Sequence, residues 1–379
     1  MIESDLNKYK ERYILVNIGI IGTGVGIRTY LNTFKQMENA NVIAISGSSK
    51  ERAKRFAKEN NIDIACKNYK ELVNLPNIDL VCITAPNKYH FEYAKYCINA
   101  NKNMILEKPA TMTIEEAKEL KTLINNSNKI NIINHQLRFN PYLLKVKEII
   151  EKGLLGRIYY INMHQQSVGF SNKNMKWTWS LEDQEGGGVR LAMGSHLIDL
   201  IRFWINKKIL TVKGNMDVVI PKRKYYDGTV RNVTVCSFFN SNLNFENNIT
   251  VNLSATCSAI GKNEFEFQIY GEDGELHFDL KNKLVGYFIN DRGMKKEITV
   301  DGVTSEERDN KVSIFSGSFI YYAKQILATI ENADDKLLEN ASKIEDAIEN
   351  QIILDAIKES AITGKVIELN SGYKSNVKY

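Results

Sequence analysis

The sequence predicts an α/β protein with two domains: an N-terminal Rossmann domain with a doubly wound parallel sheet, and a C-terminal α+β domain with a large open sheet. Strands alternate with helices over about 135 residues, which is the pattern of a parallel sheet covered on both faces. Beyond that point apolar residues recur at every second position, which is typical of strands that bury one face. A length of 379 residues also exceeds that of one ordinary domain. We expect domains at residues 1–136 and 137–379.

The composition is that of a globular protein, with 43% apolar and 25% charged residues. Its 50 basic and 45 acidic residues are interspersed, so the net charge of +5 predicts no nucleic-acid surface. No apolar run approaches the ~20 residues of a membrane span. The first thirteen residues are charged and lack a signal-peptide core, so we expect a cytoplasmic protein without a membrane partner. The five cysteines include no Cys-x-x-Cys pair, which argues against a disulfide framework and a metal site.

The first strand, expected at residues 14–21, leads into a glycine-rich turn and a helical pattern. In this context the glycines indicate a dinucleotide-binding turn. Gly22 permits the tight turn, and Gly24 lets a pyrophosphate approach the backbone. Ile27 stands where a third Gly or Ala is usual, with Gly26 just before it, so a plain strand–helix turn remains an alternative.

The second strand, expected at residues 41–45, bears on the choice of dinucleotide. NAD-binding units usually place an acidic residue at its end, where it holds the ribose 2′-hydroxyl. Here Ser46, Ser48 and the cationic Arg52 follow instead. Hydroxyl groups and a cation suit a 2′-phosphate, so the sequence favours NADP over NAD. Ser48 and Glu51 also form a capping-box pattern for the next helix, and the two roles are compatible.

The dipeptide Lys108-Pro109 joins a strand to a helix. The strand is expected at the apolar residues 103–106, and Thr113 and Glu116 form a capping box that opens the helix. A lysine in this place lies at the carboxyl edge of the sheet, where open α/β sheets bind ligands. Taken alone, the dipeptide is also compatible with a solvated loop lysine.

The C-terminal half carries a run of three glycines, residues 186–188, and then a helix that opens at Ser195. His196 and Asp199 are three residues apart and share one face of this helix. We expect the glycines to allow the close approach of a ligand or cofactor. For the two polar residues alone, a cap-region histidine or a surface pair is the alternative.

The alternating segments of this half predict a mostly antiparallel sheet with one face covered by helices. The strands are expected near residues 212–220, 230–239, 249–257 and 264–269. The other face must be solvated or buried in an oligomer, so we expect a homodimer or homotetramer formed through the open sheet.

Five motifs occur in order along the chain. They are Gly22-x-Gly24, Thr84-x-Pro86-Asn87-x-x-His90, Glu107-Lys108-Pro109, Arg138-Phe139-Asn140-Pro141, and Gly186-Gly187-Gly188 followed by Gly194-Ser195-His196-x-x-Asp199. With them the chain resembles the Gfo/Idh/MocA oxidoreductases over nearly its whole length. The resemblance implies a nicotinamide cofactor on the first domain and a substrate between the domains. The expected function is therefore NAD(P)-dependent hydride transfer to or from a hydroxyl or keto group of a sugar, cyclitol or sugar derivative.

The resemblance also implies that Lys108 and His196 are catalytic. A neutral imidazole is suited to accept a hydroxyl proton near pH 7, and a cation stabilises the developing alkoxide. Asp199 is expected to orient His196 or to pair with it. The expected cofactor-binding residues are Gly22, Thr23, Gly24, Val25, Gly26, Ile27, Ser46, Ser48, Arg52, Thr84, Pro86, Asn87, His90, Glu107, Lys108, Gln136 and Trp177.

One position departs from the family pattern. Many catalytic members carry an aspartate four residues before the histidine, and this chain has Ala192 there. The change weakens an inositol-dehydrogenase assignment more than redox catalysis in general, because Lys108 and His196 remain. The main alternative is a non-catalytic dinucleotide- or sugar-sensing regulatory protein of the same fold, and a non-redox enzyme that retains a nicotinamide ranks below it. Arg190 is a candidate contact for an acidic substrate group.

Overall fold

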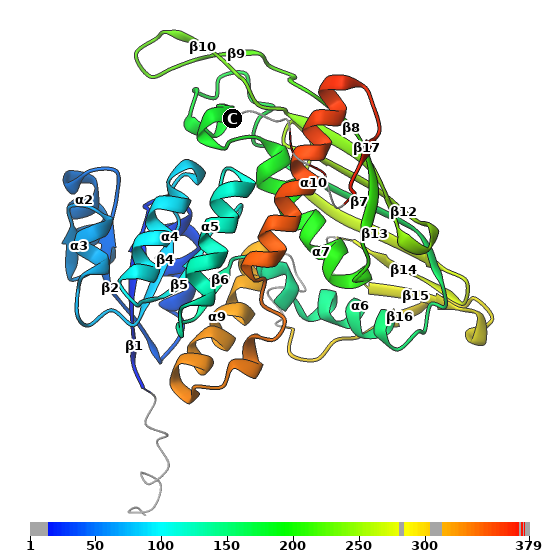
Figure 1. Ribbon diagram of the computed structural model, residues 1–379, viewed down its shortest axis with the longest axis horizontal. Helices are drawn as coiled ribbons and strands as arrows, with labels where there is room; N and C mark the ends of the chain where they lie inside the picture. Colours follow the sequence, from blue (N-terminus) through cyan, green and yellow to red (C-terminus); the bar gives the residue numbers. More distant parts are fainter. Residues whose placement is uncertain (1–13, 280–283, 304–312, 371–372, 374, 376–379) are drawn as a thin grey trace, which may run out of the picture.

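The computed structural model describes residues 14–279, 284–303, 313–370, 373 and 375. In this part of the chain a six-stranded parallel sheet and a nine-stranded mixed sheet lie beside each other, with helices between them (Figure 1). The predicted fold class, a Rossmann sheet combined with an open and mostly antiparallel sheet, is confirmed.

The parallel sheet is built from β1 (Val16–Ile21), β2 (Ala40–Ser46), β3 (Ile64–Cys66), β4 (Leu80–Ile83), β5 (Asn103–Leu106) and β6 (Asn131–Ile133). Its strand order is β3-β2-β1-β4-β5-β6, and every pair is parallel. This doubly wound order brings the carboxyl ends of the strands to one edge, where the order reverses between β1 and β4. The connecting helices are η1 (Gly26–Leu31), α1 (Asn32–Phe34), α2 (Lys50–Asn60), α3 (Tyr69–Val73), α4 (His90–Asn99) and α5 (Ile114–Asn125).

The nine-stranded sheet contains one parallel pair, between β7 and β12, and its other pairs are antiparallel. Its strands, in spatial order, are β16 (Lys296–Ile298), β15 (Leu284–Phe288), β14 (Gly274–Phe278), β13 (Glu264–Gly271), β7 (Ile158–Gln166), β12 (Ile249–Thr256), β11 (Phe238–Phe245), β8 (Ile209–Asp217) and β17 (Ile367–Glu368).

The single strand expected at residues 230–239 is wrong. The segment splits into β10 (Val230–Asn232), which pairs with β9 (Lys222–Lys224) in a separate hairpin, and the start of β11. The physical reason is a small apolar cluster between the two parts, where Val233 and Val235 pack with Leu181 and leave the line of the sheet.

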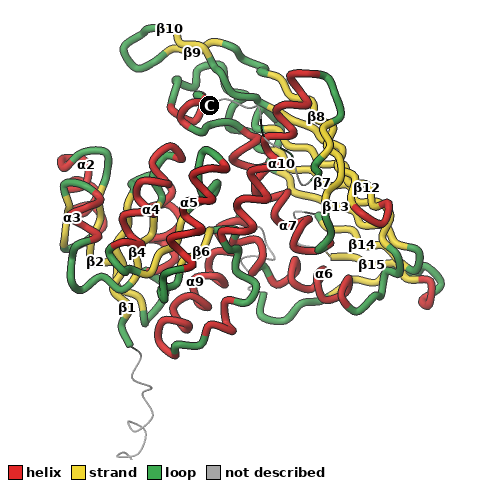
Figure 2. Tube along the Cα trace, viewed as in Figure 1, coloured by secondary structure: helices red, strands yellow, loops and turns green. Residues whose placement is uncertain are grey.

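Helices cover one face of the large sheet, as Figure 2 shows for α6 (Pro141–Glu151), α7 (Ser195–Ile205) and α10 (Ile344–Thr363). The helix α9 (Ile314–Asn332) turns back to the parallel sheet, where Phe319 and Tyr322 are fully buried in the same apolar cluster as Tyr30. The first residues of α10 join the cluster on the opposite face of that sheet. The division at residue 136 stays a prediction, and late segments of the chain contribute to the first core.

The five cysteines are all buried and free. Among the described residues, no helix is both long and apolar enough to cross a membrane.

Candidate active site

The turn after β1 has the conformation that its glycines require. Gly22 has φ = +118°, and a Cβ there would lie 2.5 Å from the carbonyl oxygen of Thr84. A Cβ on Gly26 would lie 2.6 Å from Thr84 Oγ1, so Gly26 provides the close helix–strand contact usually made by the third small residue. This contact falls one residue before Ile27, at the first residue of η1. A Cβ on Gly24 would meet no atom within 4 Å, so the space in front of this backbone is open.

The residues after β2 lie next to this turn. Ser46 is buried at the strand end, whereas Ser48 and Arg52 are exposed. The Arg52 Nε donates to Thr23 Oγ1 at 2.6 Å, which holds the guanidinium across the glycine turn. The predicted N-cap Ser48 is wrong by one residue: Ser49 caps α2, and its side chain accepts from the backbone N–H of Arg52.

The loop after β4 connects the two halves of the molecule. Thr84 Oγ1 donates to the carbonyl of Ile21 at 2.9 Å, which ties β4 to β1. The Asn87 side chain donates to the carbonyl of Gly186 at 2.6 Å. The neighbouring Lys88 pairs with Glu185, also at 2.6 Å. Asn87, predicted as a cofactor contact, thus holds the glycine run against the Rossmann edge.

Two further predicted cofactor contacts, His90 and Glu107, form hydrogen bonds with other protein groups. The ring nitrogens of the fully buried His90 lie 2.7 Å from the carbonyl oxygen of Pro109 and 2.9 Å from that of Ala85. Glu107 Oε1 accepts a hydrogen bond from the Tyr30 hydroxyl at 2.8 Å. It accepts a second one at 2.7 Å from the side-chain amide of Asn134, which follows β6. These contacts fix the loop that carries the catalytic lysine candidate.

Lys108 reaches across from the end of β5 to the C-terminal half. Its Nζ donates to the carbonyl oxygen of Ala192 at 2.6 Å. Ala192 lies in η6 (Arg190–Gly194), one helical turn before His196. Burial lowers the pKa of Lys108, although the neighbouring Glu107 acts to raise it.

His196 lies in the first turn of α7 and is 5% exposed. Its ring contacts Phe315 at a centroid distance of 4.9 Å and stands perpendicular to the His135 ring at 5.8 Å. Within the described residues Nδ1 is enclosed and has no hydrogen-bond partner, whereas Nε2 is not enclosed in this way. Burial, followed by the charges of Lys108 and His135, holds the pKa of His196 well below its ordinary value. The ring is therefore neutral near pH 7, and it lies close enough to Lys108 to respond to its charge.

The predicted pairing of Asp199 with His196 is wrong. Asp199 instead accepts two hydrogen bonds from Arg138, from Nε at 2.8 Å and from Nη2 at 2.7 Å, and a third from Asn350 at 3.0 Å. The reason is burial: a carboxylate that is 1% exposed needs a counter-charge, and the guanidinium of Arg138 offers two donors in matching geometry. Burial acts to raise the pKa of Asp199, but Arg138 and His135 hold it at about 2.

The glycine run at residues 186–188 was predicted to allow the close approach of a ligand or cofactor, and the structure gives a different reason for it. Cβ atoms at residues 186, 187 and 188 would lie 2.3–2.8 Å from Asn87, Ser180 and Val235 respectively. Close approach of these protein segments, rather than of a ligand, therefore requires the three glycines. Gly186 and Gly188 also have φ of +79° and +93°, which other residues rarely adopt.

Three other sequence candidates lie in defined surroundings. Trp177 donates its indole N–H to the carbonyl of Asn232 at 2.9 Å, at the β9–β10 hairpin. Gln136 is buried, and its Oε1 has no hydrogen-bond partner within the described part of the chain. Arg190 is 3% exposed and donates to the carbonyl of Leu354 at 3.1 Å, so its predicted contact with substrate is wrong.

His135 and Arg138 are not among the site residues predicted from the sequence, and the structure brings both to the site. Both follow β6 and therefore lie at the same sheet edge as Lys108. Their position directly after an expected strand is the feature of the sequence that could have identified them as site residues. The described residues contain no cluster of three metal-ligating side chains.

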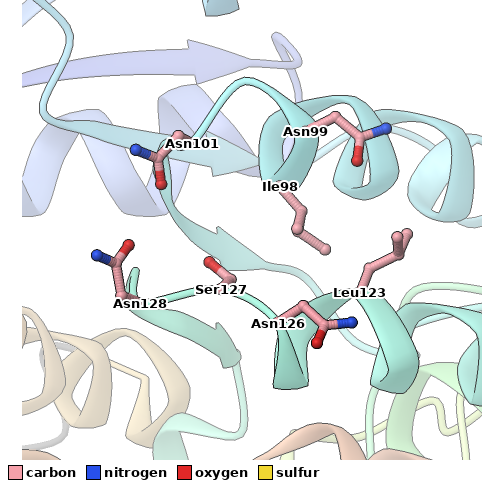
Figure 3. Close-up of a pocket in the computed structure, with 7 residues that line it drawn as sticks. All are labelled: Ile98, Asn99, Asn101, Leu123, Asn126, Ser127 and Asn128. Atoms are coloured by element: carbon pink, nitrogen blue, oxygen red, sulfur yellow. The ribbon is translucent and has the colours of Figure 1, made fainter.

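A surface cavity of about 450 Å³ lies elsewhere on the parallel sheet (Figure 3). It is lined by Ile98, Asn99, Asn101, Leu123, Asn126, Ser127 and Asn128. These residues precede β5 and β6, so the cavity is at the edge opposite to Lys108 and is separate from the candidate active site.

Two family models match this chain. Residues 16–135 match the GFO_IDH_MocA model, described as an oxidoreductase family with an NAD-binding Rossmann fold, and residues 143–277 match the GFO/IDH/MocA C-terminal domain. The chain belongs to the Gfo/Idh/MocA oxidoreductase family. The resemblance drawn from the sequence motifs is thereby confirmed.

Relatives of this Gfo/Idh/MocA protein match most of its length. An uncharacterised oxidoreductase of Synechocystis sp. is 28% identical over 69% of this chain and 71% of its own. Glucose-fructose oxidoreductase domain-containing protein 1 of Mus musculus is 22% identical over 93% of this chain and 92% of its own. Levoglucosan dehydrogenase in complex with NADH and levoglucosan has the same fold, with a TM-score of 0.81 at 22% identity, over 94% of this chain and 99% of that one.

Proposed function

We propose that this protein transfers hydride between a nicotinamide dinucleotide and a hydroxyl or keto carbon of a sugar, cyclitol or sugar derivative. The observation that carries the proposal is the convergence of Lys108 and His196. The Nζ of Lys108 donates a hydrogen bond to the backbone carbonyl of Ala192, one helical turn before His196, so the ammonium after β5 lies near the start of the helix that carries the imidazole. The sugar-like substrate is supported by the relative of the same fold that is described in complex with NADH and levoglucosan.

The residues at the end of β1 fit a dinucleotide. The tight turn at Gly22 and the open space in front of Gly24 leave room for a pyrophosphate to approach the backbone. When bound, the nicotinamide supplies the carbon that accepts or donates hydride.

The chain's own residues move and stabilise charge. In the oxidation direction, His196 Nε2 accepts the proton of the substrate hydroxyl, because the ring is neutral near pH 7. The ammonium of Lys108 stabilises the alkoxide that develops at the same oxygen. Burial lowers the pKa of Lys108, which favours sharing of this proton between the two groups. In the reduction direction the same groups return the proton.

The test combines dinucleotide binding with turnover. Fluorescence titration with NADPH and NADH is followed by a screen of polyols and keto-sugars, and Lys108→Met is compared with Lys95→Met. Lys95 pairs with Glu119 on the protein surface and serves as the matched control. We expect kcat to fall roughly 10²- to 10⁴-fold for Lys108→Met alone. Full turnover by Lys108→Met refutes its role, and failure to bind either dinucleotide refutes the proposal.

A second candidate function is that of a dinucleotide- or sugar-sensing regulator. It is favoured by Ala192, whose methyl side chain has no acid or base group where many catalytic relatives carry a carboxylate. This candidate predicts tight dinucleotide binding without hydride transfer to any polyol or keto-sugar. Oxidation of a single such substrate excludes it.

We infer a preference for NADP over NAD. No acidic residue stands directly at the end of β2, where Ser46, Gly47 and Ser48 lie, and the exposed Arg52 is anchored beside the glycine turn by Thr23. A guanidinium forms strong charge-assisted hydrogen bonds with a phosphate. Arg52→Ala is expected to weaken NADPH binding about 10-fold or more and NADH binding much less. Equal losses for the two dinucleotides, measured by fluorescence titration, contradict the preference.

We also infer a homodimer or homotetramer assembled through the outer face of the nine-stranded sheet. Side chains on this face bond to one another across strands, as Asn162 does with Gln268 at 2.9 Å and Asn252 with the Tyr160 hydroxyl at 2.8 Å. These hydrogen bonds hold polar side chains of the outer face in one conformation, which lowers the entropy cost of association. The five buried free thiols support a reducing compartment such as the cytoplasm.

A further inference from the structure

A second buried imidazole lies beside His196. His135 follows β6, is 2% exposed, and has its ring perpendicular to that of His196 with the centroids 5.8 Å apart. Its Nδ1 lies 3.0 Å from Ser342 Oγ and 3.5 Å from Asp199 Oδ1. Its Nε2 is enclosed and has no hydrogen-bond partner among the described residues.

Each of the two rings has one buried nitrogen without a hydrogen-bond partner among the described residues. His196 leaves Nδ1 enclosed without a partner, and His135 leaves Nε2 in the same state. A buried polar atom without a partner costs roughly 1–3 kcal/mol. One hydrogen bond between these nitrogens removes both costs, provided that one of them carries a hydrogen and the other a lone pair.

Asp199 determines which nitrogen of His135 carries the hydrogen. Its carboxylate is ionised near neutral pH, because Arg138 and His135 hold its pKa at about 2 against the effect of burial. An ionised carboxylate only accepts hydrogen bonds. The Ser342 hydroxyl at 3.0 Å can accept as well as donate, so a hydrogen on Nδ1 of His135 suits both of its neighbours, and Nε2 then carries the lone pair. Burial also lowers the pKa of His135 to about 4, so this ring is neutral near pH 7.

We propose that His135 is a positioning residue that accepts a hydrogen bond from Nδ1–H of His196 during turnover. This inference rests on the proposed function. Two imidazoles joined by such a bond have centroids roughly 5.3 Å apart, because their nitrogens are about 3 Å apart. From the observed 5.8 Å the rings form the bond by approaching roughly half an ångström with His196 Nδ1 turned toward His135 Nε2, and catalytic hydrogen bonds commonly tighten in this way when substrate binds.

The bond fixes the tautomer that the proton transfer requires. With the hydrogen on Nδ1, His196 presents the lone pair of Nε2 to the substrate hydroxyl. The hydroxyl proton moves to Nε2, hydride leaves the same carbon for the nicotinamide, and His135 keeps its own proton throughout. The imidazolium formed on His196 then donates to His135, which in turn faces the carboxylate of Asp199. This arrangement gives His196 a protein partner in a chain that has Ala192 in place of an aspartate.

The test measures the tautomer of His196 directly and needs no substrate. The chain has five histidines, so long-range ¹⁵N–¹H spectra of histidine-labelled protein resolve each ring. We expect His196 to carry its hydrogen on Nδ1 in the unmodified protein with bound dinucleotide. His135→Phe should abolish this preference, whereas His135→Gln should keep it, because its side-chain oxygen accepts a hydrogen bond near the place of Nε2. His277→Phe, on the outer face of the large sheet, is the control and should leave the tautomer of His196 unchanged.

Two results overturn the proposal: His196 carrying its hydrogen on Nε2 in the unmodified protein, or an unchanged tautomer in folded His135→Phe. If His135→Phe does not fold, the unmodified protein and His135→Gln decide the question. Kinetics add an independent measure, since kcat should fall roughly 10²- to 10⁴-fold in His135→Phe with little change in KM, and should recover in His135→Gln. A protein that turns over no substrate refutes the proposed function, and the spectra still decide the role of His135.

Discussion

Replacing Asp199 by asparagine should destabilise the protein by roughly 2–5 kcal/mol, because it leaves the guanidinium of Arg138 buried without its main counter-charge. Arg138 is 5% exposed and Asp199 is 1% exposed, so water replaces little of the lost interaction. The lower figure follows from the pKa of Asp199, which falls from 3.8 to about 2; each tenfold change in acid dissociation corresponds to about 1.4 kcal/mol. The upper figure is typical of breaking one side of a buried ion pair.

Urea unfolding of the two proteins measures this difference. The control is Glu272→Gln, which breaks the exposed Arg157–Glu272 pair, 2.7 Å long and with both side chains more than half exposed. Exposed pairs contribute about 0–1 kcal/mol, so the control should change stability little. The reasoning is refuted if Asp199→Asn costs no more than Glu272→Gln.

The stability difference between the unmodified protein and Asp199→Asn should also depend on pH in a defined direction. Since the pKa of Asp199 is lower in the folded protein, its contribution is complete above the unfolded value of 3.8 and is lost as the pH falls toward about 2. The stability gap between the unmodified protein and Asp199→Asn should therefore be constant from about pH 5 to 7 and shrink below about pH 4.

Two further predictions concern the cofactor turn and the outer sheet face. Gly22→Ala should abolish dinucleotide binding in fluorescence titrations, because φ is +118° and the new Cβ lies 2.5 Å from the carbonyl of Thr84; unchanged binding would mean that this turn does not hold the dinucleotide. Asn252→Arg places a charge at the centre of the outer face and should yield monomers in light scattering, with dinucleotide binding retained. An oligomer that persists in this variant contradicts assembly through that face.

The sequence predicted the site where local patterns decide it. Gly22 and Lys108 each follow an apolar strand, and a strand end is visible in sequence because the run of buried residues stops there. The partner of Asp199 was not predictable in this way. Arg138 is 61 residues distant in the chain, and only the packing of α7 against the segment after β6 brings the two charges together. The N-cap of α2 was missed by one residue because Ser48 and Ser49 are chemically equivalent, and backbone conformation chooses between them.

The contacts of the glycine run at residues 186–188 were also not predictable from the sequence, for another reason. Glycine has no side chain to indicate what approaches it, so the sequence alone does not distinguish a ligand from a protein segment. At Gly187 the approaching atom is the carbonyl oxygen of Ser180, 2.3 Å from the place of a Cβ. The presence of close approach was predicted correctly, and its partner was not.

The return of α9 to the parallel sheet affects how the chain reaches its native state on the ribosome. Phe319 and Tyr322 complete the apolar layer beneath β1, yet they are synthesised almost two hundred residues after the last strand of that sheet. The nascent N-terminal half therefore emerges with the α9-binding part of one sheet face uncovered until nearly all of the polypeptide has been translated. Chaperones that shield exposed apolar surface during synthesis have their longest opportunity to bind there.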